Sequence, residues 1–398
     1  MPENRKKILI VHNYYQIPGG EDTVVQNEKK MLEEHGYEVT LYTRHNSELK
    51  ELSKLQKIFL PFSTIFNWKV YKTIQTLIKE KQIQVVHVHN TLNMISPSVY
   101  YAALHCKVPV VQTIHNFRLL CPGADFFRDG KICEDCLKKG MMCAVKHGCY
   151  RDSKVQTLAC VVSTLFHRMT GVYGKLNYIC LTEFNKKKIL QLKQIKEHKV
   201  HVKPNFVEPA KTVIPFSERE NQFIYAGRLD ETKGIQILLQ AWSVMGENAP
   251  QLLICGNGPL ENWCKNYIEQ HRLKTVKMVG FVPNEQVKDY IGASKALILP
   301  TQWYEGFPMT ILEAYSRGTP VIGSDLGNTG SLIIEGKSGM KFCHSSAEDL
   351  AKTVKEMEQK RNFFDEAFIT KYSLQANYEQ LREIYETCCN NNEYSGTV

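Results

Sequence analysis

Short apolar runs, each ending in polar or glycine-rich residues, recur along both halves of the chain. They predict strands at 7–12, 37–43, 83–90, 109–116 and 178–184 in the first half, and at 221–229, 251–258, 276–282, 295–300 and 319–325 in the second. Amphipathic segments such as 23–36, which Gly36 closes, predict helices between the strands. This alternation indicates an α/β fold with two Rossmann-like, doubly wound parallel sheets.

The segment KPNFVEP at 203–209 separates the two series of strands, and we interpret it as a hinge. We therefore expect an N-terminal domain at 1–204, with a cysteine-rich insertion at 117–151, and a C-terminal domain at 205–371. The amphipathic tail at 372–398 is predicted to form a helix that returns to the N-terminal domain. Two domains facing a cleft would bind a ligand between them.

Polar side chains follow the predicted strands of the first half, where parallel sheets collect their ligands. They are His12, His89, Asn90, His115 and Asn116. The pair Gly19-Gly20 after the first strand would let backbone N–H groups approach phosphates. Taken alone, such a pair is also typical of an ordinary turn, and a histidine at a strand end is also typical of a structural role.

The segment YEGFPMTILEAYSRGTPVIGSD, at 304–325, carries two glutamates eight positions apart, Glu305 and Glu313. Pro308 is favoured in the first turn of a helix, so Glu305 is expected just before a helix and Glu313 within it. Free N–H groups at a helix start attract phosphate or sugar oxygens. One carboxylate could face a sugar and the other a ribose, whereas the simpler alternative is a helix cap and a surface glutamate.

Two further loops of the second half have residue types that suit a nucleotide. In GRLDETKG, at 227–234, Arg228 and Lys233 flank a tight turn and would clamp a diphosphate. In CGNGP, at 255–259, glycines would let the backbone approach a base or ribose. A solvated loop and a plain turn are the ordinary alternatives.

Taken together, GGED, QTIHN, PNFVEP, GRLDETKG, GNGP, GFVP and EGFPMTILEA occur in the order seen in the retaining glycosyltransferases of family 4, and the chain resembles that family over about residues 7–385. The resemblance implies the GT-B fold and transfer of a sugar from a nucleotide diphosphate sugar, with retained anomeric configuration and no catalytic cofactor. One departure is SDLGNTGSLI, where Asn328 and Ser331 replace the Pro-Glu pair that is frequent in the family.

The resemblance also implies roles for individual residues. Arg228 and Lys233 would hold the diphosphate, Glu305 and His115 would lie beside the donor sugar, and Glu313 would bind the ribose. The residues expected to be catalytic are Glu305, His115, Arg228 and Lys233, and those expected to contact the donor are Gly19, Gly20, Gly227, Gly256, Gly258, Gly306, Phe307, Pro308 and Glu313.

Other enzyme classes fit these motifs less well. A glycosidase needs two carboxylates across one bond, which a helix start between Glu305 and Glu313 disfavours, and it has no use for a phosphate clamp. A nicotinamide oxidoreductase lacks support because no G-x-G-x-x-G follows the first strand. An epimerase or phosphorylase with two Rossmann domains, and a binding module without catalysis, remain as rivals.

Charge is distributed unevenly over the 398 residues. Residues 1–205 carry 31 Lys and Arg against 17 Asp and Glu, although the whole chain has a net charge of only +9. The segments 54–72 and 155–175 mix aromatic residues with lysines, so they are either core helices or helices at an anionic membrane surface. We expect a cytoplasmic enzyme, peripheral on the membrane, that acts on a lipid-linked saccharide in surface-polysaccharide assembly. The sequence contains no nucleic-acid-binding motif, no signal peptide and no span of about 20 apolar residues.

Six of the 13 cysteines fall between Cys106 and Cys149. Cys133-x-x-Cys136 has the spacing of a zinc knuckle, and Cys121 and Cys149 could complete a tetrahedral set of four thiolates. The family resemblance supports this quartet, through the pattern CP…CxxC…CYR. We therefore expect a structural zinc held by Cys121, Cys133, Cys136 and Cys149. Reduced cysteines without metal, or a zinc-dependent nucleic-acid reader, are the alternatives.

Overall fold

The computed structural model describes residues 6–16, 19–51, 53–360 and 363–393. Its strands are β1 (Lys7–Tyr14), β2 (Glu38–His45), β3 (Val85–Asn90), β4 (Val110–Ile114), β5 (Phe127–Arg128), β6 (Lys131–Ile132), β7 (Asn177–Cys180), β8 (Val200–Val202), β9 (Glu220–Ala226), β10 (Gln251–Cys255), β11 (Val276–Gly280), β12 (Ser294–Leu299), β13 (Val321–Ser324) and β14 (Gly339–Phe342).

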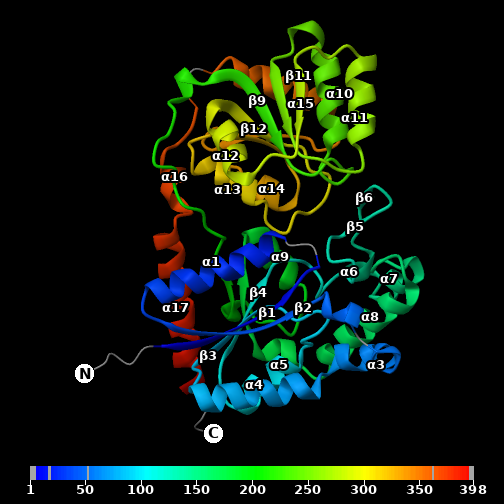
Figure 1. Cartoon of the computed structure of the whole chain (residues 1–398), viewed down its shortest axis with the longest axis vertical. Coiled ribbons are helices and arrows are strands. Elements are labelled where there is room, and N and C mark those ends of the chain that lie inside the picture. Colours follow the sequence, from blue (N-terminus) through cyan, green and yellow to red (C-terminus); the bar gives the residue numbers. More distant parts are fainter. Residues whose placement is uncertain (1–5, 17–18, 52, 361–362, 394–398) are drawn as a thin grey trace. The chain divides into compact units, whose positions relative to one another are not determined.

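The α-helices alternate with these strands (Figure 1). They are α1 (Gly20–Glu34), α2 (Glu48–Glu51), α3 (Lys54–Ile65), α4 (Trp68–Lys81), α5 (Ser98–His105), α6 (Asp135–Lys138), α7 (Met142–His147), α8 (Lys154–Met169), α9 (Glu183–Ile189), α10 (Ile235–Met245), α11 (Glu261–Gln270), α12 (Asn284–Ala293), α13 (Met309–Tyr315), α14 (Gly327–Leu332), α15 (Ala347–Glu358), α16 (Ala367–Lys371) and α17 (Leu374–Glu393).

The chain forms two compact units. The first comprises 1–124, 134–204 and 377–398, and the second comprises 125–133 and 205–376. The division at 204/205 lies inside the segment interpreted as a hinge. The cysteine-rich insertion expected at 117–151 is divided, because residues 125–133, with the β5–β6 hairpin, group with the second unit.

The first unit is built on one parallel sheet with the strand order β2-β1-β3-β4-β7-β8. The strand order reverses between β1 and β3, and α/β sheets bind ligands beyond the carboxyl ends of such strands. Strands β3 and β4 are buried along their whole length, as expected for a sheet covered by helices on both faces.

The second unit has the order β11-β10-β9-β12-β13-β14, again with parallel pairing throughout. Numbered within the unit this is 3-2-1-4-5-6, the order of Rossmann domains, with the reversal between β9 and β12. Two apolar clusters cover the two faces of the sheet, one around Trp242 and the other around Tyr315. The reversal point therefore presents the loops after β9 and β12 side by side.

Helix α17 belongs to the first unit from Asn377 onward. The Tyr385 hydroxyl lies 2.7 Å from Nδ1 of buried His87, and the Tyr378 ring stacks on His35 at a centroid distance of 3.7 Å. These contacts tie the end of the chain to strand β3 and to the region following α1. Residues 394–398, which the tail prediction included, lie outside the described residues.

Several predicted boundaries were wrong for local reasons. The strand expected over 178–184 ends at Cys180, because the Thr182 side chain accepts from the Asn185 N–H and caps α9. The first helix begins at Gly20 rather than at residue 23. The helix that contains Glu313 begins at Met309, one residue after Pro308. The short strands β8 and β14 were missed, because three or four residues carry little periodicity.

The segments 54–72 and 155–175 form helices with one buried and one exposed face. In α8, Cys160, Val161 and Thr164 are buried, while an apolar stripe on the other side is exposed. Helices α3 and α7 contact α8. The exposed apolar side chains of these helices and of the start of α4 are here called the apolar patch: Phe59, Phe62, Trp68, Met142, Val155, Leu158, Val162, Phe166 and Met169. Within the described residues no helix has both the length and the apolar character needed to cross a bilayer.

Candidate functional site

The loop after β9 is a tight turn that Asp230 organises. Its carboxylate oxygen Oδ1 accepts from the Thr232 hydroxyl at 2.7 Å and from the Lys233 backbone N–H at 3.0 Å. Gly234 follows with φ +70°, and a Cβ there would lie 1.7 Å from the carbonyl oxygen of Pro300, so this position requires glycine. The turn after β9 therefore packs directly against the backbone that follows β12, and these two strands flank the reversal point of the sheet.

Two predicted site residues meet in this place. Lys233 Nζ lies 2.6 Å from Glu305 Oε1, and the Glu305 side chain is only 8% exposed. Lys233 also lies over the Trp303 ring, 5.6 Å from its centroid. Arg228, by contrast, is 67% exposed, with its Nε 3.5 Å from the Asp230 carboxylate. One cation of the expected clamp is thus held against a buried carboxylate, and the other projects toward solvent.

The backbone around Glu305 is fixed by a residue to which the sequence assigned no role. The Asn328 side-chain amide donates to the carbonyl oxygens of Glu305 and Gly306 at 2.6 and 2.7 Å. Asn328 is fully buried and stands where the family resemblance led us to expect a different residue pair. The two N–H groups of its amide can satisfy two carbonyl acceptors. The need for such a donor at position 328 is apparent only once the structure brings the two loops together.

Glu313 lies in α13 and is 8% exposed. Its Oε1 accepts from the Asn284 amide at 3.1 Å. Helix α13 has its N-cap at Pro308, and the partly buried Phe307 ring packs against the apolar cluster around Tyr315. Glu305 therefore points to the Lys233 side of the site and Glu313 to the Asn284 side.

A pocket of about 370 Å³, open to solvent, lies at the ends of β9, β10 and β11. Its lining includes Gly227, Arg228, Gly256, Asn257, Phe281, Asn284 and Thr310. Gly256 has φ +139°, and a Cβ there would lie 1.9 Å from the Gly227 carbonyl oxygen; at Gly258 the nearest atom would be the Leu229 carbonyl oxygen at 2.5 Å. Close packing of the two loops is therefore sufficient to require glycine at positions 256 and 258, without any ligand. Phe281, 75% exposed, adds a flat apolar surface beside this pocket.

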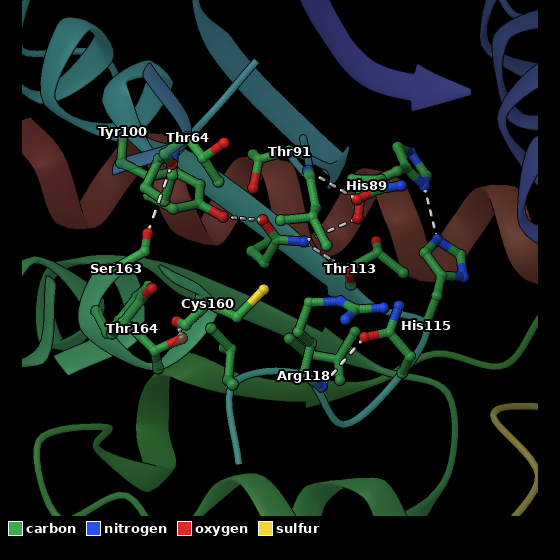
Figure 2. A pocket seen from close by; sticks show the side chains of 18 residues that line it. Thr64, His89, Thr91, Tyr100, Thr113, His115, Arg118, Cys160, Ser163 and Thr164 are labelled. Carbon is green, nitrogen blue, oxygen red and sulfur yellow. Dashed lines mark hydrogen bonds between the residues drawn. The ribbon is translucent and has the colours of Figure 1, made fainter. Parts of the chain in front are cut away.

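Four of the polar residues predicted at the strand ends of the first unit line a different cavity, whereas the described residues His12, Gly19 and Gly20 are not part of its lining. It has a volume of about 90 Å³, and His89, Asn90, Thr91, His115, Asn116 and Arg118 are among its lining residues (Figure 2). Gly19 is the N-cap of α1, where its N–H donates to the Asp22 carboxylate at 3.0 Å, and Gly20 begins the helix. The glycine pair expected after the first strand therefore forms the N-cap and the first residue of α1.

Buried ionisable groups surround the start of α1. His12 Nε2 lies 2.7 Å from the Asp22 carboxylate, and the Tyr15 hydroxyl donates to Glu21 Oε2 at 3.0 Å. Burial raises the pKa of Glu21 to about 8, and it lowers the pKa of His12 to about 4. Removal from water disfavours the charged form of both groups.

The structure brings together three of the four cysteines predicted to bind zinc. The Cys136 thiol hydrogen-bonds with Cys121 and lies near Cys149, and these two neighbours, together with burial, raise its pKa. Cys133 groups with the second unit. Cys121, Cys136 and Cys149 are thus near enough to interact, and thiolates are donors that zinc binds tetrahedrally.

Comparison with known proteins identifies the family of this chain. The model of group 1 glycosyl transferases matches residues 207–371, and the model of glycosyltransferase family 4 matches residues 18–131. The amylovoran biosynthesis glycosyltransferase AmsK of Erwinia amylovora is 27% identical over 206 residues, which cover 47% of this chain and 51% of AmsK. The matched part spans about a third to a half of the length of such curated relatives as AmsK.

Solved structures agree in fold. The lipopolysaccharide outer core galactosyltransferase WaaB superposes with a TM-score of 0.67 and 18% identity, over 96% of this chain and 99% of WaaB. HepE of Anabaena, solved with UDP and glucose, superposes with a TM-score of 0.62 and 14% identity, over 96% of this chain and 100% of HepE. The two parts of the chain thus each match a glycosyltransferase family model, and the chain has the GT-B fold.

Proposed function

We propose that this protein transfers a hexosyl sugar from a nucleotide diphosphate sugar, with UDP or GDP as the nucleotide, to a saccharide acceptor, and that the anomeric configuration is retained. The observation that carries the proposal is the pairing of Lys233 with Glu305 at the strand-order reversal of the second unit, beside a pocket lined by glycine. Nucleotides are bound at this reversal in Rossmann domains. The UDP and glucose named with HepE support a donor of this class.

In this proposal the nucleotide occupies the pocket at the ends of β9, β10 and β11. The exposed ring of Phe281, which lines this pocket, offers a stacking surface for a flat base. Glu313, held by Asn284, presents a carboxylate oxygen to the ribose hydroxyls. The diphosphate then lies toward Arg228 and Lys233, where the exposed Arg228 side chain is available to turn onto it.

The chemical step needs charge stabilisation more than acid–base catalysis. As the bond between the anomeric carbon and the diphosphate oxygen breaks, negative charge grows on the diphosphate and positive charge on the sugar. Lys233 and Arg228 would stabilise the first, and the Glu305 carboxylate the second. The acceptor hydroxyl attacks from the same face, and its proton passes to the departing phosphate oxygen, so that the products are a glycoside and the nucleoside diphosphate.

The acceptor is proposed to be linked to a lipid, and the enzyme to lie peripherally on the cytoplasmic face of a membrane. The apolar patch on α3 and α8 supports this, because large apolar side chains such as Phe62 and Phe166 are exposed there. Arg151, Lys154 and Lys69 are exposed on the same elements or next to them, and they suit anionic headgroups. The comparison with AmsK, named for amylovoran biosynthesis, supports a role in surface-polysaccharide assembly.

The cysteine cluster is proposed to hold a structural zinc ion with the thiolates of Cys121, Cys133, Cys136 and Cys149. The convergence of three of these sulfurs supports it. Bound zinc would order the segment around α6 and α7 and would take no part in sugar transfer. The four cysteine thiols would lose their protons when zinc binds, because the thiolate is the form that coordinates the metal.

The test is a screen of UDP- and GDP-sugars by thermal shift, followed by measurement of donor hydrolysis by the purified chain. Lys233→Met and Arg228→Met should each lower turnover at least about tenfold, since a charge-assisted contact to the leaving group contributes about 1.5–3 kcal/mol. Lys274→Met is the matched control, because Lys274 is exposed before the amino end of β11, whereas the pocket lies beyond the carboxyl ends of β9, β10 and β11. Nearly normal turnover in both site variants would refute the clamp.

The same assay separates the rival activities. An epimerase would convert the donor to an isomer without an acceptor, and a binding module would shift the melting temperature without releasing a nucleoside diphosphate. Release of nucleoside diphosphate and a sugar with the donor's anomeric configuration supports a retaining transferase. The configuration is read by NMR before the sugar mutarotates.

A further inference from the structure

The indole ring of Trp303 lies in the loop between β12 and α13, two positions before Glu305. The Lys233 ammonium, 2.6 Å from the Glu305 carboxylate, is also 5.6 Å from the centroid of this ring, which is within the range of a cation–π contact. The ring is partly buried. Trp303 is therefore a near neighbour of the two charged residues of the candidate site, although no motif in the sequence assigned it a role.

Backbone contacts hold Trp303 beside Lys233. The Gln302 N–H donates to the Thr232 carbonyl oxygen at 2.8 Å, so the residue just before Trp303 is joined to the residue just before Lys233. The Gln302 side-chain amide also donates to the His344 carbonyl oxygen, at 2.6 Å. Because these bonds anchor the loop just before Trp303, the position of the indole beside the ammonium follows from the fold.

The Trp303 indole N–H has no acceptor in the described part of the chain, although its nitrogen is buried. An indole N–H is a donor only, so its role does not depend on a tautomer or on a neighbouring charge. Trp242 shows how the chain treats the same group elsewhere, because its Nε1 donates to the Pro250 carbonyl oxygen at 2.9 Å. A buried donor without an acceptor is destabilising, and such a group in a folded protein calls for an explanation, of which a bound ligand is one.

The neighbouring charge indicates which kind of acceptor suits this donor. Lys233 Nζ and Trp303 Nε1 both donate hydrogen bonds and cannot accept them. A phosphate oxygen is their complement, because it accepts without donating and carries the charge that an ammonium neutralises. A sugar hydroxyl matches less well, because it is uncharged and its own proton needs an acceptor.

We propose that the Trp303 indole N–H donates to a phosphate oxygen of the bound nucleoside diphosphate, next to the Lys233 ammonium, so that Trp303 is a further residue that binds the leaving group. The inference rests on the proposed function for its ligand, and it adds an uncharged contact to the two cations expected there. The ring also gives Lys233 an aromatic face to lie on when the ammonium leaves the Glu305 carboxylate for the diphosphate.

Indole ¹H–¹⁵N spectra of the full chain, labelled at its four tryptophans, test this contact directly. The Trp303→Phe variant assigns the Trp303 signal by its disappearance. UDP or GDP, whichever raises the melting temperature in the donor screen, and inorganic diphosphate should each move that signal downfield, because a new hydrogen bond to an anionic oxygen forms. The free nucleoside should not move it. The Trp242 signal, from an indole that already has its acceptor, should stay in place with every probe.

Calorimetric titration measures what the contact contributes. Trp303→Phe keeps an aromatic face for Lys233 and removes the N–H, so it should weaken binding of the nucleoside diphosphate at least about tenfold and leave the affinity for the free nucleoside unchanged. Trp263→Phe is the matched control, because Trp263 lies in α11 and packs against the apolar cluster around Trp242. A structural role of the Trp303 ring alone would change the melting temperature but not the preference for the diphosphate over the nucleoside.

The outcomes separate this contact from the proposed function. If the nucleoside diphosphate binds but the Trp303 signal stays in place, or if the nucleoside moves it as far, the contact is wrong and the proposed function stands. If neither UDP nor GDP binds to the wild type, the proposed function fails and the contact fails with it. A downfield shift with both phosphate-bearing probes, together with the loss of affinity in Trp303→Phe, supports the contact.

Discussion

The ion pair between Lys203 and Glu28 makes the most quantitative prediction. Lys203→Met would leave the Glu28 carboxylate, 1% exposed, without its cation, and the Asn377 oxygen that now accepts from Lys203 at 3.0 Å would lose its donor. Removing one partner of a buried ion pair costs about 3–5 kcal/mol, because the remaining charge is left uncompensated. The first unit has about 220 residues. For a unit of that size each kcal/mol lowers the melting temperature by about 2–4 °C, so we expect a loss of about 6–20 °C.

Calorimetric unfolding measures this loss, and two further variants interpret it. Lys187→Met makes the same chemical change at an exposed position of α9 and should move the melting temperature by no more than about 2 °C. The double variant Glu28→Gln with Lys203→Met removes both charges and should recover at least half of the loss. If Lys203→Met unfolds like the Lys187→Met control, the reasoning about a buried charge is wrong.

Acid gives the same pair a second signature. The pKa of Glu28 is lower in the folded chain than its ordinary value of 4.5. Its contribution is therefore present above about pH 4.5 and is lost as the pH falls through the folded pKa. The stability difference between the wild type and the double variant should shrink in that acid range and stay constant from pH 6 to 8.

The remaining predictions concern other parts of the chain. Because Glu21 has a pKa of about 8 when folded and 4.5 as its ordinary value, the wild type should lose stability relative to Glu21→Gln as the pH rises from 5 to 9; melting curves that shift in parallel would contradict this. Untreated protein should contain about one zinc per chain by elemental analysis, Cys136→Ser should lose it, and the exposed Cys343→Ser should retain it; an equal metal content in the two variants would exclude the site. Phe62→Ser with Phe166→Ser should reduce sedimentation with vesicles of phosphatidylglycerol at least about tenfold, and unchanged binding would remove the apolar patch from the proposal.

Sequence periodicity was sufficient to predict the architecture. Ten buried strands with helices between them predicted two parallel sheets, and both are present. The position of Glu305 before α13 and of Lys233 after a turn could also be predicted, because turn and helix-start signals are local. The roles assigned to these residues stay predictions until a donor is bound.

The partners of the site residues were not accessible from the sequence. Nothing in the motif EGFPMTILEA indicates that Asn328, 23 positions after Glu305, holds that loop, or that Asn284 binds Glu313. The same is true of Lys203, whose partner Glu28 lies 175 positions earlier. A hydrogen bond between distant positions leaves no periodic signal in a single chain, so only the folded sheet reveals it.

The sequence by itself determined which residues become strands and helices, since apolar periodicity and turn chemistry act over a few neighbouring positions. The tertiary structure alone decided the order of the strands, and with it which loops meet at the two reversal points. That order sets the pairing of Lys233 with Glu305 and of Lys203 with Glu28. Buried charges and rings must find partners within hydrogen-bond distance, and those partners are neighbours in space rather than along the chain.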